Sequence, residues 1–371
     1  MVLGIDASRA NNKQKTGVEW YAYHLIQELK KIIPEEIQVV LYSDKPLQGD
    51  LADLPKNWRS KVLHWPPKRL WTQVRLSFEM FISPPDVLFI PAHVFPIIHP
   101  KKTIMTVHDI AAIKFPESYN WFERWYSLWS AKRALKKLWK IIVPSEFAKK
   151  ELSVFGDQTS ISVEVVKHGF DKRYKVISDE DKINSVLQKY KINKPFIMTV
   201  GRLEEKKNTV RIIKAFNMLK DRNSNLQLRL LLVGNPGHGY KKVEQAMQNS
   251  PYKNDIMQPG WVGEKDLPYI MNAAEVFVFP SLYEGFGLPV LEAFACGTPT
   301  VVSKDSSLEE VSEGASVLVD PQSVEEICNG VLNLLDNSNL RQEKIELGLE
   351  RVEKFSWKKC ASDTFEIIGK K

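Results

Sequence analysis

Short apolar runs alternate with helical stretches along the whole of this 371-residue chain. Each run is only a few residues long and is followed by a loop and then an amphipathic segment. This alternation predicts α/β units in which parallel strands are covered by helices on both faces. We expect strands at 2–6, 38–42, 87–90, 103–107 and 141–144, and then at 196–201, 228–233, 276–279 and 300–303. We expect helices at 19–32, 121–138 and 209–219, and another that starts near residue 145.

The two series of strands predict two Rossmann-like domains that face a cleft. A chain of 371 residues is long enough for two ordinary α/β domains, each with its own core. We expect the first domain at 1–170 and the second at 171–354. The amphipathic C-terminal segment, 355–371, is expected to pack back on the first domain as a helix.

The composition excludes several classes of protein. Hydrophobic residues make up 43% of the chain, which rules out a disordered protein. The sequence has no apolar run of 18 residues, and it begins directly with a predicted strand, so we expect neither a spanning helix nor a signal peptide. Cys296, Cys328 and Cys360 are far apart, which argues against a disulfide framework or a metal cluster. We therefore expect a cytoplasmic protein.

The positive charge is concentrated in the first half of the chain. Residues 1–170 hold 24 Lys and Arg against 17 Asp and Glu, and eight of the ten tryptophans precede residue 140. A basic, aromatic face suits a membrane surface, an anionic acceptor or nucleic acid; we expect no nucleic acid partner. The predicted helix at 121–138 places Trp121, Trp125 and Trp129 on one face, which either packs on the core or contacts the membrane from the cytoplasmic side.

The block EGFGLPVLE at 284–292 encloses a glycine-rich turn between two carboxylates. It follows the predicted strand at 276–279, and Pro289 suits the start of a helix. Glu284 should therefore lie in the loop, and Glu292 in the first turn of the helix. Glycine lets backbone N–H groups approach a ligand, and a helix N-terminus favours negative charge. The block thus suits a sugar nucleotide, although such a turn equally serves structure alone in a doubly wound sheet.

Two cations follow another predicted strand. The segment VGRLEEKKN places Arg202 and Lys207 beyond the strand at 196–201. Ligands of open α/β sheets bind beyond the carboxyl ends of the strands, and an arginine fork with a lysine charge suits a diphosphate. A solvated surface turn is the alternative interpretation.

Three further segments follow strands or precede helices. His108 and Asp109 end one strand, where they can hydrogen-bond sugar hydroxyls; a structural role or a cap is the alternative. Gly17 precedes a helix whose start can accept a phosphate. The segment 234–239 lacks the spacing of a dinucleotide fingerprint, so we interpret it as a flexible loop.

Taken together, these motifs resemble the retaining glycosyltransferases of family 4, the group 1 glycosyltransferases with the GT-B fold. The resemblance covers nearly the whole chain and is most specific in the Glu-x7-Glu block. The motifs that carry it are TGVEWY, TVHDI, VPSEF, the HGFD hinge at 168–171, VGRLEEKKN, SLYEGFGLPVLEAFACGTPTVVS and FSW. Glu309 and His168 stand where the family usually has Pro and often has Asn, positions that bear on subgroup and not on chemistry.

The resemblance implies roles for the residues of the 284–292 block. Glu284 would hold hydroxyls of the donor sugar, and Glu292 would bind the ribose hydroxyls. The donor would also meet the turn between them, at Gly285, Phe286, Gly287 and Leu288.

The resemblance also implies roles outside that block. Arg202 and Lys207 match the family's diphosphate clamp, and Gly17 matches the glycine beside the donor phosphate. His108 matches the histidine near the sugar. The base is expected near Trp261 and Val262.

The implied activity is metal-independent hexosyl transfer (EC 2.4.1 type) with retention of configuration, in cell-surface polysaccharide synthesis such as that of lipopolysaccharide. We expect a nucleotide diphosphate sugar, with GDP-mannose as the first choice and no further cofactor, and a saccharide or lipid-linked acceptor. The alternatives are a glycoside hydrolase that uses Glu284 and Glu292, a nicotinamide oxidoreductase, and a non-catalytic protein that binds sugar nucleotides.

Overall fold

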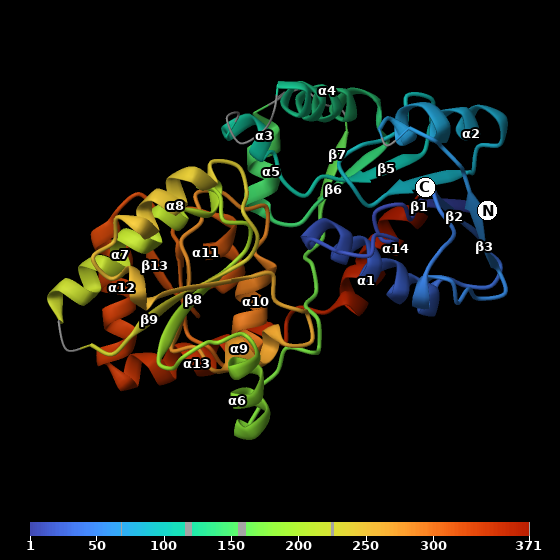
Figure 1. Ribbon diagram of the computed structural model, residues 1–371. Helices are drawn as coiled ribbons and strands as arrows, with labels where there is room; N and C mark the ends of the chain where they lie inside the picture. The colour runs from blue at the N-terminus through green and yellow to red at the C-terminus, as the bar shows by residue number, and fades with distance from the viewer. Residues whose placement is uncertain (68, 116–120, 155–160, 224–225, 371) are drawn as a thin grey trace. The chain divides into compact units, whose positions relative to one another are not determined.

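The computed structural model describes residues 1–67, 69–115, 121–154, 161–223 and 226–370; for residues 112, 113, 121–124 and 127 it describes the backbone alone. The chain divides into two compact units, each built on a parallel sheet (Figure 1). Of the described residues, the first unit contains those at 1–114, 121–169 and 355–370, and the second contains Phe115 and those at 170–354.

The first unit has a seven-stranded sheet in the order β3-β2-β1-β4-β5-β6-β7. The strands are β1 (Val2–Asp6), β2 (Gln38–Ser43), β3 (Trp58–Val62), β4 (Val87–Ile90), β5 (Thr103–Thr106), β6 (Lys140–Val143) and β7 (Ser162–Val165). In the centre, Leu3 of β1 pairs with Val39 and Val87 on its two sides. The central strands are apolar throughout because helices cover both faces of the sheet.

Helices lie on both faces of this first sheet. In the view of Figure 1, α2 and α4 lie above the sheet, and α1 and α14 lie below it. The helices are α1 (Gly17–Ile32), η1 (Gly49–Leu51), η2 (Trp71–Leu76), α2 (Ser77–Ile82), α3 (Ala111–Lys114), α4 (Trp121–Lys137), α5 (Glu146–Ser153) and α14 (Trp357–Gly369). α14 packs on α1, and Gly169 lies so near it that an added Cβ would stand 2.1 Å from the Trp357 nitrogen.

The second unit has a six-stranded sheet in the order β10-β9-β8-β11-β12-β13. The strands are β8 (Phe196–Val200), β9 (Arg229–Val233), β10 (Ile256–Gly260), β11 (Val276–Phe279), β12 (Thr300–Ser303) and β13 (Val317–Val319). The helices are α6 (Glu180–Lys189), η4 (Glu205–Lys207), α7 (Thr209–Arg222), α8 (Tyr240–Gln248), η5 (Lys253–Asp255), α9 (Leu267–Asn272), α10 (Leu288–Ala295), α11 (Ser307–Ser312), α12 (Val324–Asp336) and α13 (Ser338–Val352). Its core joins apolar side chains of β8, β9 and β11 to those of α7 and α12.

In both sheets the order in which strands are added reverses at one place. The chain moves outward from β1 to β3 and then returns to add β4 on the other side of β1; β8 and β11 repeat this arrangement. Loops that leave adjacent strands in opposite directions open a crevice at such a switch point, and ligands of doubly wound sheets bind there. The topology therefore directs attention to the loops after β8 and β11, and after β1 and β4.

The predicted α/β class with two parallel-sheet units is confirmed. The nine predicted strands are present with ends within one residue, whereas β3, β7, β10 and β13 were not predicted. Within the described ranges, we find no helix that combines the length and apolar character needed to cross a bilayer.

Candidate active site

Two charged side chains meet at the switch point of the second sheet. Lys207 lies in the turn after β8 and Glu284 in the loop after β11, and Lys207 Nζ stands 2.5 Å from Glu284 Oε1. The two side chains are only 18% and 13% exposed, and Nζ also lies 4.9 Å from the centre of the Phe279 ring. Charges so poorly solvated interact strongly with each other and with any ion that enters the site.

Asn208 holds the two loops together. It adopts left-handed backbone angles, with φ of +61°, and its side chain is buried. Its Nδ2 donates to the carbonyls of Pro280, at 2.8 Å, and Pro321, at 2.6 Å. The Leu282 N–H adds a backbone bond to the Lys206 carbonyl at 2.9 Å. The sequence analysis missed Asn208; the signal was an asparagine, a residue that tolerates left-handed angles, immediately before a predicted helix.

Arg202 is placed differently from Lys207. Its side chain is 66% exposed, and its Nε lies 3.8 Å from a Glu204 carboxylate oxygen. The stem of Lys207 instead lies along Gly201, where an added Cβ would stand 3.4 Å from Lys207 Cε. The predicted pair of cations thus consists of one fixed ammonium and one solvated guanidinium on the same loop.

The segment 234–239 forms a loop, as predicted, and backbone hydrogen bonds tie it to the loop after β8. The Leu203 N–H donates to the Asn235 carbonyl at 3.0 Å, and the Gly237 N–H donates to the Leu203 carbonyl at 3.1 Å. At Gly234 an added Cβ would stand 1.9 Å from the Gly201 oxygen, so only glycine allows this approach. The segment therefore supports the loop that carries Arg202 and Lys207.

A helix N-terminus borders the Lys207–Glu284 pair. α10 begins at Leu288 with Pro289 in its first turn, as predicted for Pro289. Gly287 precedes it with φ of +119°, and an added Cβ there would stand 2.5 Å from Leu308 Cδ2. Gly285 lies in the same turn, while Phe286 is buried and so offers a ligand its backbone. Free N–H groups at such a helix start attract anions.

Glu292 lies in the second turn of α10, not in the first turn as predicted, because the helix begins at Leu288. Burial raises the pKa of its carboxyl to about 8, and the nearby carboxylate of Asp171 adds to this rise. Arg173 and a hydrogen bond from Tyr174 oppose it. A carboxyl in these surroundings is well placed to exchange hydrogen bonds with hydroxyl groups.

Trp261 and Val262 follow β10, the strand at the edge of the second sheet. The Trp261 side chain is 44% exposed, whereas the Val262 side chain is buried. A ligand can therefore meet the ring of Trp261 but only the backbone of Val262.

His108 lies in the first unit among other rings. Its Nε2 stands 3.1 Å from the Pro91 carbonyl oxygen, and its ring packs edge-on to Tyr21 with centres 4.6 Å apart. Burial, with a smaller contribution from His93, lowers the pKa of His108 to about 3. The imidazole is therefore neutral at physiological pH, and Nε2 carries the hydrogen that the carbonyl accepts.

The other two predicted residues of the first unit serve local structure as well. Asp109 Oδ1 accepts the Ala111 N–H at 3.1 Å, which is the capping role given as its alternative. Gly17 is the first residue of α1, and nothing lies within 4 Å of an added Cβ there. A capping box fixes this helix start, because the Glu19 carboxylate accepts the Thr16 N–H at 2.9 Å. The start of α1 is thus ordered and open on the side of Gly17.

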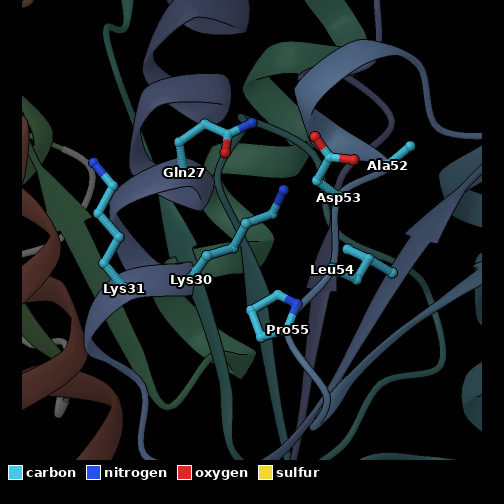
Figure 2. A pocket seen from close by; sticks show the side chains of 7 residues that line it. All are labelled: Gln27, Lys30, Lys31, Ala52, Asp53, Leu54 and Pro55. Carbon is cyan, nitrogen blue, oxygen red and sulfur yellow. The ribbon is translucent and has the colours of Figure 1, made fainter.

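Two of the pockets in the described part of the first unit lie beside α1. The larger, about 620 Å³, is bordered by α1 and the segment that follows η1 (Figure 2). None of the predicted site residues lines it, and Lys30 at its centre already donates to the Asp50 carbonyl at 2.6 Å. The smaller, about 270 Å³, is lined by polar groups and by the rings of Trp20 and Tyr23.

Two family models cover nearly the whole chain. The model for "Glycosyltransferase Family 4" matches residues 15–173, and the model for "Glycosyl transferases group 1" matches residues 180–351. The second match spans the site around Lys207, Glu284 and Glu292.

Curated relatives agree with these matches. The chain is 30% identical to O-antigen chain mannosyltransferase B of Escherichia coli over 265 residues, which are 71% of this chain and 69% of that protein. It is 28% identical to the serotype-specific mannosyltransferase WbdA of Escherichia coli over 71% of this chain, but it spans only 32% of WbdA.

Solved structures show the same fold. Sucrose-phosphate synthase of Thermosynechococcus elongatus superposes with a TM-score of 0.77 at 18% identity, over 99% of this chain and 98% of that one. Anabaena HepE, in complex with UDP and glucose, superposes with a TM-score of 0.73 at 17% identity, over 100% and 99% of the two chains. The fold is the GT-B fold. Together with the family matches and the 30% identical relative, this shows that the chain belongs to glycosyltransferase family 4, the group 1 glycosyltransferases.

Proposed function

We propose that this glycosyltransferase moves mannose from a nucleotide diphosphate sugar, GDP-mannose, to a saccharide or lipid-linked saccharide, with retention of configuration. The observation that carries the proposal is the Lys207–Glu284 pair at the switch point of the second sheet, next to the start of α10. The mannosyl group is chosen because the relative with 30% identity is named an O-antigen chain mannosyltransferase.

The second unit supplies the groups that a departing diphosphate needs. Lys207 is a largely buried ammonium, Arg202 is a solvated guanidinium on the same loop, and Gly287 leads directly into the N-terminus of α10. Positive charge aimed at a leaving group stabilises the transition state more than the ground state, because negative charge grows as the bond breaks. We assign diphosphate binding and leaving-group stabilisation to these three elements.

The two acidic side chains have separate tasks in this proposal. Glu284 accepts hydrogen bonds from hydroxyls of the hexose, and Lys207 neutralises its charge through their ion pair. Glu292 accepts hydrogen bonds from the ribose. The leaving phosphate itself assists removal of the acceptor proton on the same face of the sugar, so no protein nucleophile is assigned.

The smaller pocket of the first unit is suited to a saccharide. Sugars stack their apolar faces on aromatic rings and exchange hydrogen bonds with amides and charged groups. Trp20 and Tyr23 supply the rings, and Asn12, Lys15 and Asp50 supply the polar groups. We propose this pocket as the first place to test for the acceptor.

Glycoside hydrolysis by Glu284 and Glu292 explains the structure less well. A hydrolase needs one free acid and one base or nucleophile across the scissile bond. Here Glu284 is ion-paired with Lys207, and hydrolysis of a simple glycoside would leave Lys207 without a task. A non-catalytic binding protein would use the same groups, so only turnover separates that alternative from transfer.

The test begins with a thermal-shift screen of GDP, UDP, ADP and their sugar conjugates, because a ligand of the folded state raises the melting temperature. The donor that binds is then incubated with candidate saccharides, and release of the nucleoside diphosphate is measured with and without EDTA. We expect GDP-mannose to bind, GDP to be released only with an acceptor, and EDTA to have no effect. Binding without turnover on any acceptor, or hydrolysis of a plain mannoside, would contradict the proposal.

A further inference from the structure

One face of the first unit exposes large apolar side chains in a group. η2 and α2 form one continuous helical stretch, Trp71–Ile82, whose inward side chains include Leu76 and Met80. Its outward side chains are apolar as well. We call these side chains, together with the neighbouring Ile97 and Ile98, the α2 face. Its members and their exposed fractions are Val74 44%, Phe78 56%, Phe81 70%, Ile82 61%, Ile97 51% and Ile98 46%.

The two isoleucines belong to the same surface as the helix. The Ser77 hydroxyl of α2 accepts the N–H of Ile97 at 2.8 Å, which places the segment 97–98 beside the helix. Arg133 of α4 donates to the Ile97 carbonyl at 2.6 Å. The segment 97–98 therefore lies between α2 and α4, on the side of the first sheet that these two helices cover (Figure 1). Single exposed apolar residues are ordinary, whereas a continuous group marks an interaction surface.

The border of the α2 face is positively charged. Lys101, Lys102, Lys136 and Lys137 are exposed on the neighbouring segment and on α4. Arg133 stacks on the Trp129 ring at 5.3 Å, and Trp125 of the same helix is 54% exposed.

Carboxylates near the α2 face are already engaged. Between residues 69 and 86 they are Glu79 and Asp86. Glu79 is buried and paired with Lys61 and Arg75. The Asp86 carboxylate accepts the Val2 N–H. The α2 face therefore presents apolar side chains and cations to its partner, while the Glu79 carboxylate is buried beneath it and the exposed Asp86 carboxylate is bonded to the backbone of β1.

We propose that the α2 face docks on an anionic lipid surface. Exposed phenylalanine and isoleucine side chains enter the boundary between headgroups and acyl chains, and bordering lysines meet lipid phosphates. Charge decides between occupants: a second copy of the chain would bring the same cations together, whereas an anionic bilayer complements them. The inference stands independently of the sugar transferred, because its residues lie outside the donor site.

The test uses the purified full chain and vesicles. Sedimentation with phosphatidylcholine vesicles, with and without about 30% phosphatidylglycerol, should show binding that needs the anionic lipid and weakens with salt. The triple variant F78S/F81S/I82S should bind at least about tenfold more weakly, because serine buries much less apolar surface in the bilayer than the side chain that it replaces. The control replaces equally exposed apolar residues elsewhere, V154S/V176S/L318S, and should bind like the wild type.

A second readout locates the contact. The native cysteines are buried, so a polarity-sensitive dye on Phe81→Cys reports only that position. Its emission should rise on addition of anionic vesicles, and a dye on Val154→Cys should not respond. Equal vesicle binding by the two triple variants would overturn the proposal. So would a wild-type dimer, seen by ultracentrifugation, that F78S/F81S/I82S dissociates without vesicle binding. Donor binding by both variants keeps this result separate from a failure of the proposed transfer.

Discussion

Replacement of Lys207 by methionine tests the site most directly. Methionine keeps much of the length of the lysine stem but removes the ammonium that lies 2.5 Å from Glu284 Oε1. Two effects follow. The Glu284 carboxylate, 13% exposed, loses its partner, and the diphosphate of the donor loses a cation while it meets an uncompensated negative charge.

The magnitudes of the two effects can be worked out separately. Removing one partner of a buried ion pair costs about 3–5 kcal/mol, and partial solvation of this pair reduces the expected loss of unfolding free energy to about 2–4 kcal/mol. A charge-assisted hydrogen bond to phosphate is worth about 1.5–3 kcal/mol, so the Kd of the nucleoside diphosphate should rise roughly 10- to 150-fold. Turnover should fall further, since charge on the leaving group grows in the transition state.

A double-mutant cycle separates the pair from the ligand. Glu284→Gln removes the carboxylate that Lys207 neutralises, so K207M/E284Q should recover most of the unfolding free energy lost in K207M. Chemical denaturation measures that recovery, and calorimetry with GDP and UDP measures the affinity. Lys242→Met serves as the control, because Lys242 forms an exposed pair with Glu205 on the same unit, and such pairs contribute about 0–1 kcal/mol. Wild-type affinity in K207M together with no coupling in the cycle would refute the role of Lys207.

Three further predictions concern the frame of the site. The pKa of Glu292 is raised to about 8 in the folded state, so the wild type should lose roughly 3 kcal/mol of unfolding free energy relative to Glu292→Gln as the pH rises from about 5 to 8. Urea denaturation of both proteins at each pH measures this loss, and a difference that does not change with pH would contradict it. Asn208→Ala should lose about 2–3 kcal/mol through the lost hydrogen bonds to Pro280 and Pro321, the lost acceptor for Arg211 and left-handed strain, and Asn208→Gly should recover only the part due to strain. Gly287→Ala should lower the melting temperature and donor affinity, and Leu308→Ala added to it should partly restore the melting temperature; an unchanged melting temperature in Gly287→Ala would refute the steric argument.

The sequence predicted the inner strands of both sheets and missed the outer ones for one physical reason. The four strands that were not predicted, β3, β7, β10 and β13, are the four edges of the two sheets. An edge strand faces solvent more than an inner strand does, so it needs no continuous apolar run. β3 reads Trp-Arg-Ser-Lys-Val and β7 reads Ser-Val-Glu-Val, patterns that do not stand out from loops.

The helical stretch 71–82 was missed for a different reason. Helix prediction from periodicity assumes that apolar residues face the core and polar residues face water. Here Phe78 and Phe81 face outward while Gln73 and Glu79 are buried. A surface that serves a partner breaks the usual pattern, so failure of the prediction and the presence of the α2 face have the same cause.

In the site, too, the positions of single residues could be predicted from the local sequence, whereas contacts between distant residues could not. Each of Lys207 and Glu284 could be proposed from its position after a strand, because the carboxyl ends of parallel strands share one edge. Their ion pair could not, since it depends on β8 and β11 being neighbours although 75 residues separate their last and first residues. Asn208 shows this most clearly, because its two acceptors, Pro280 and Pro321, come from distant parts of the chain.

The Lys207–Glu284 pair also explains how the site keeps a largely buried cation. An isolated ammonium in these surroundings would be costly, because burial removes its hydration. Glu284 compensates the charge of Lys207, and the diphosphate of a donor can replace the carboxylate as the partner of the ammonium, which frees Glu284 for the sugar. Diphosphate and hexose binding would thus be coupled through one exchange of partners. On this argument Glu284→Gln should raise the affinity for the free nucleoside diphosphate, because the carboxylate no longer competes for Lys207, whereas independent subsites would leave that affinity unchanged.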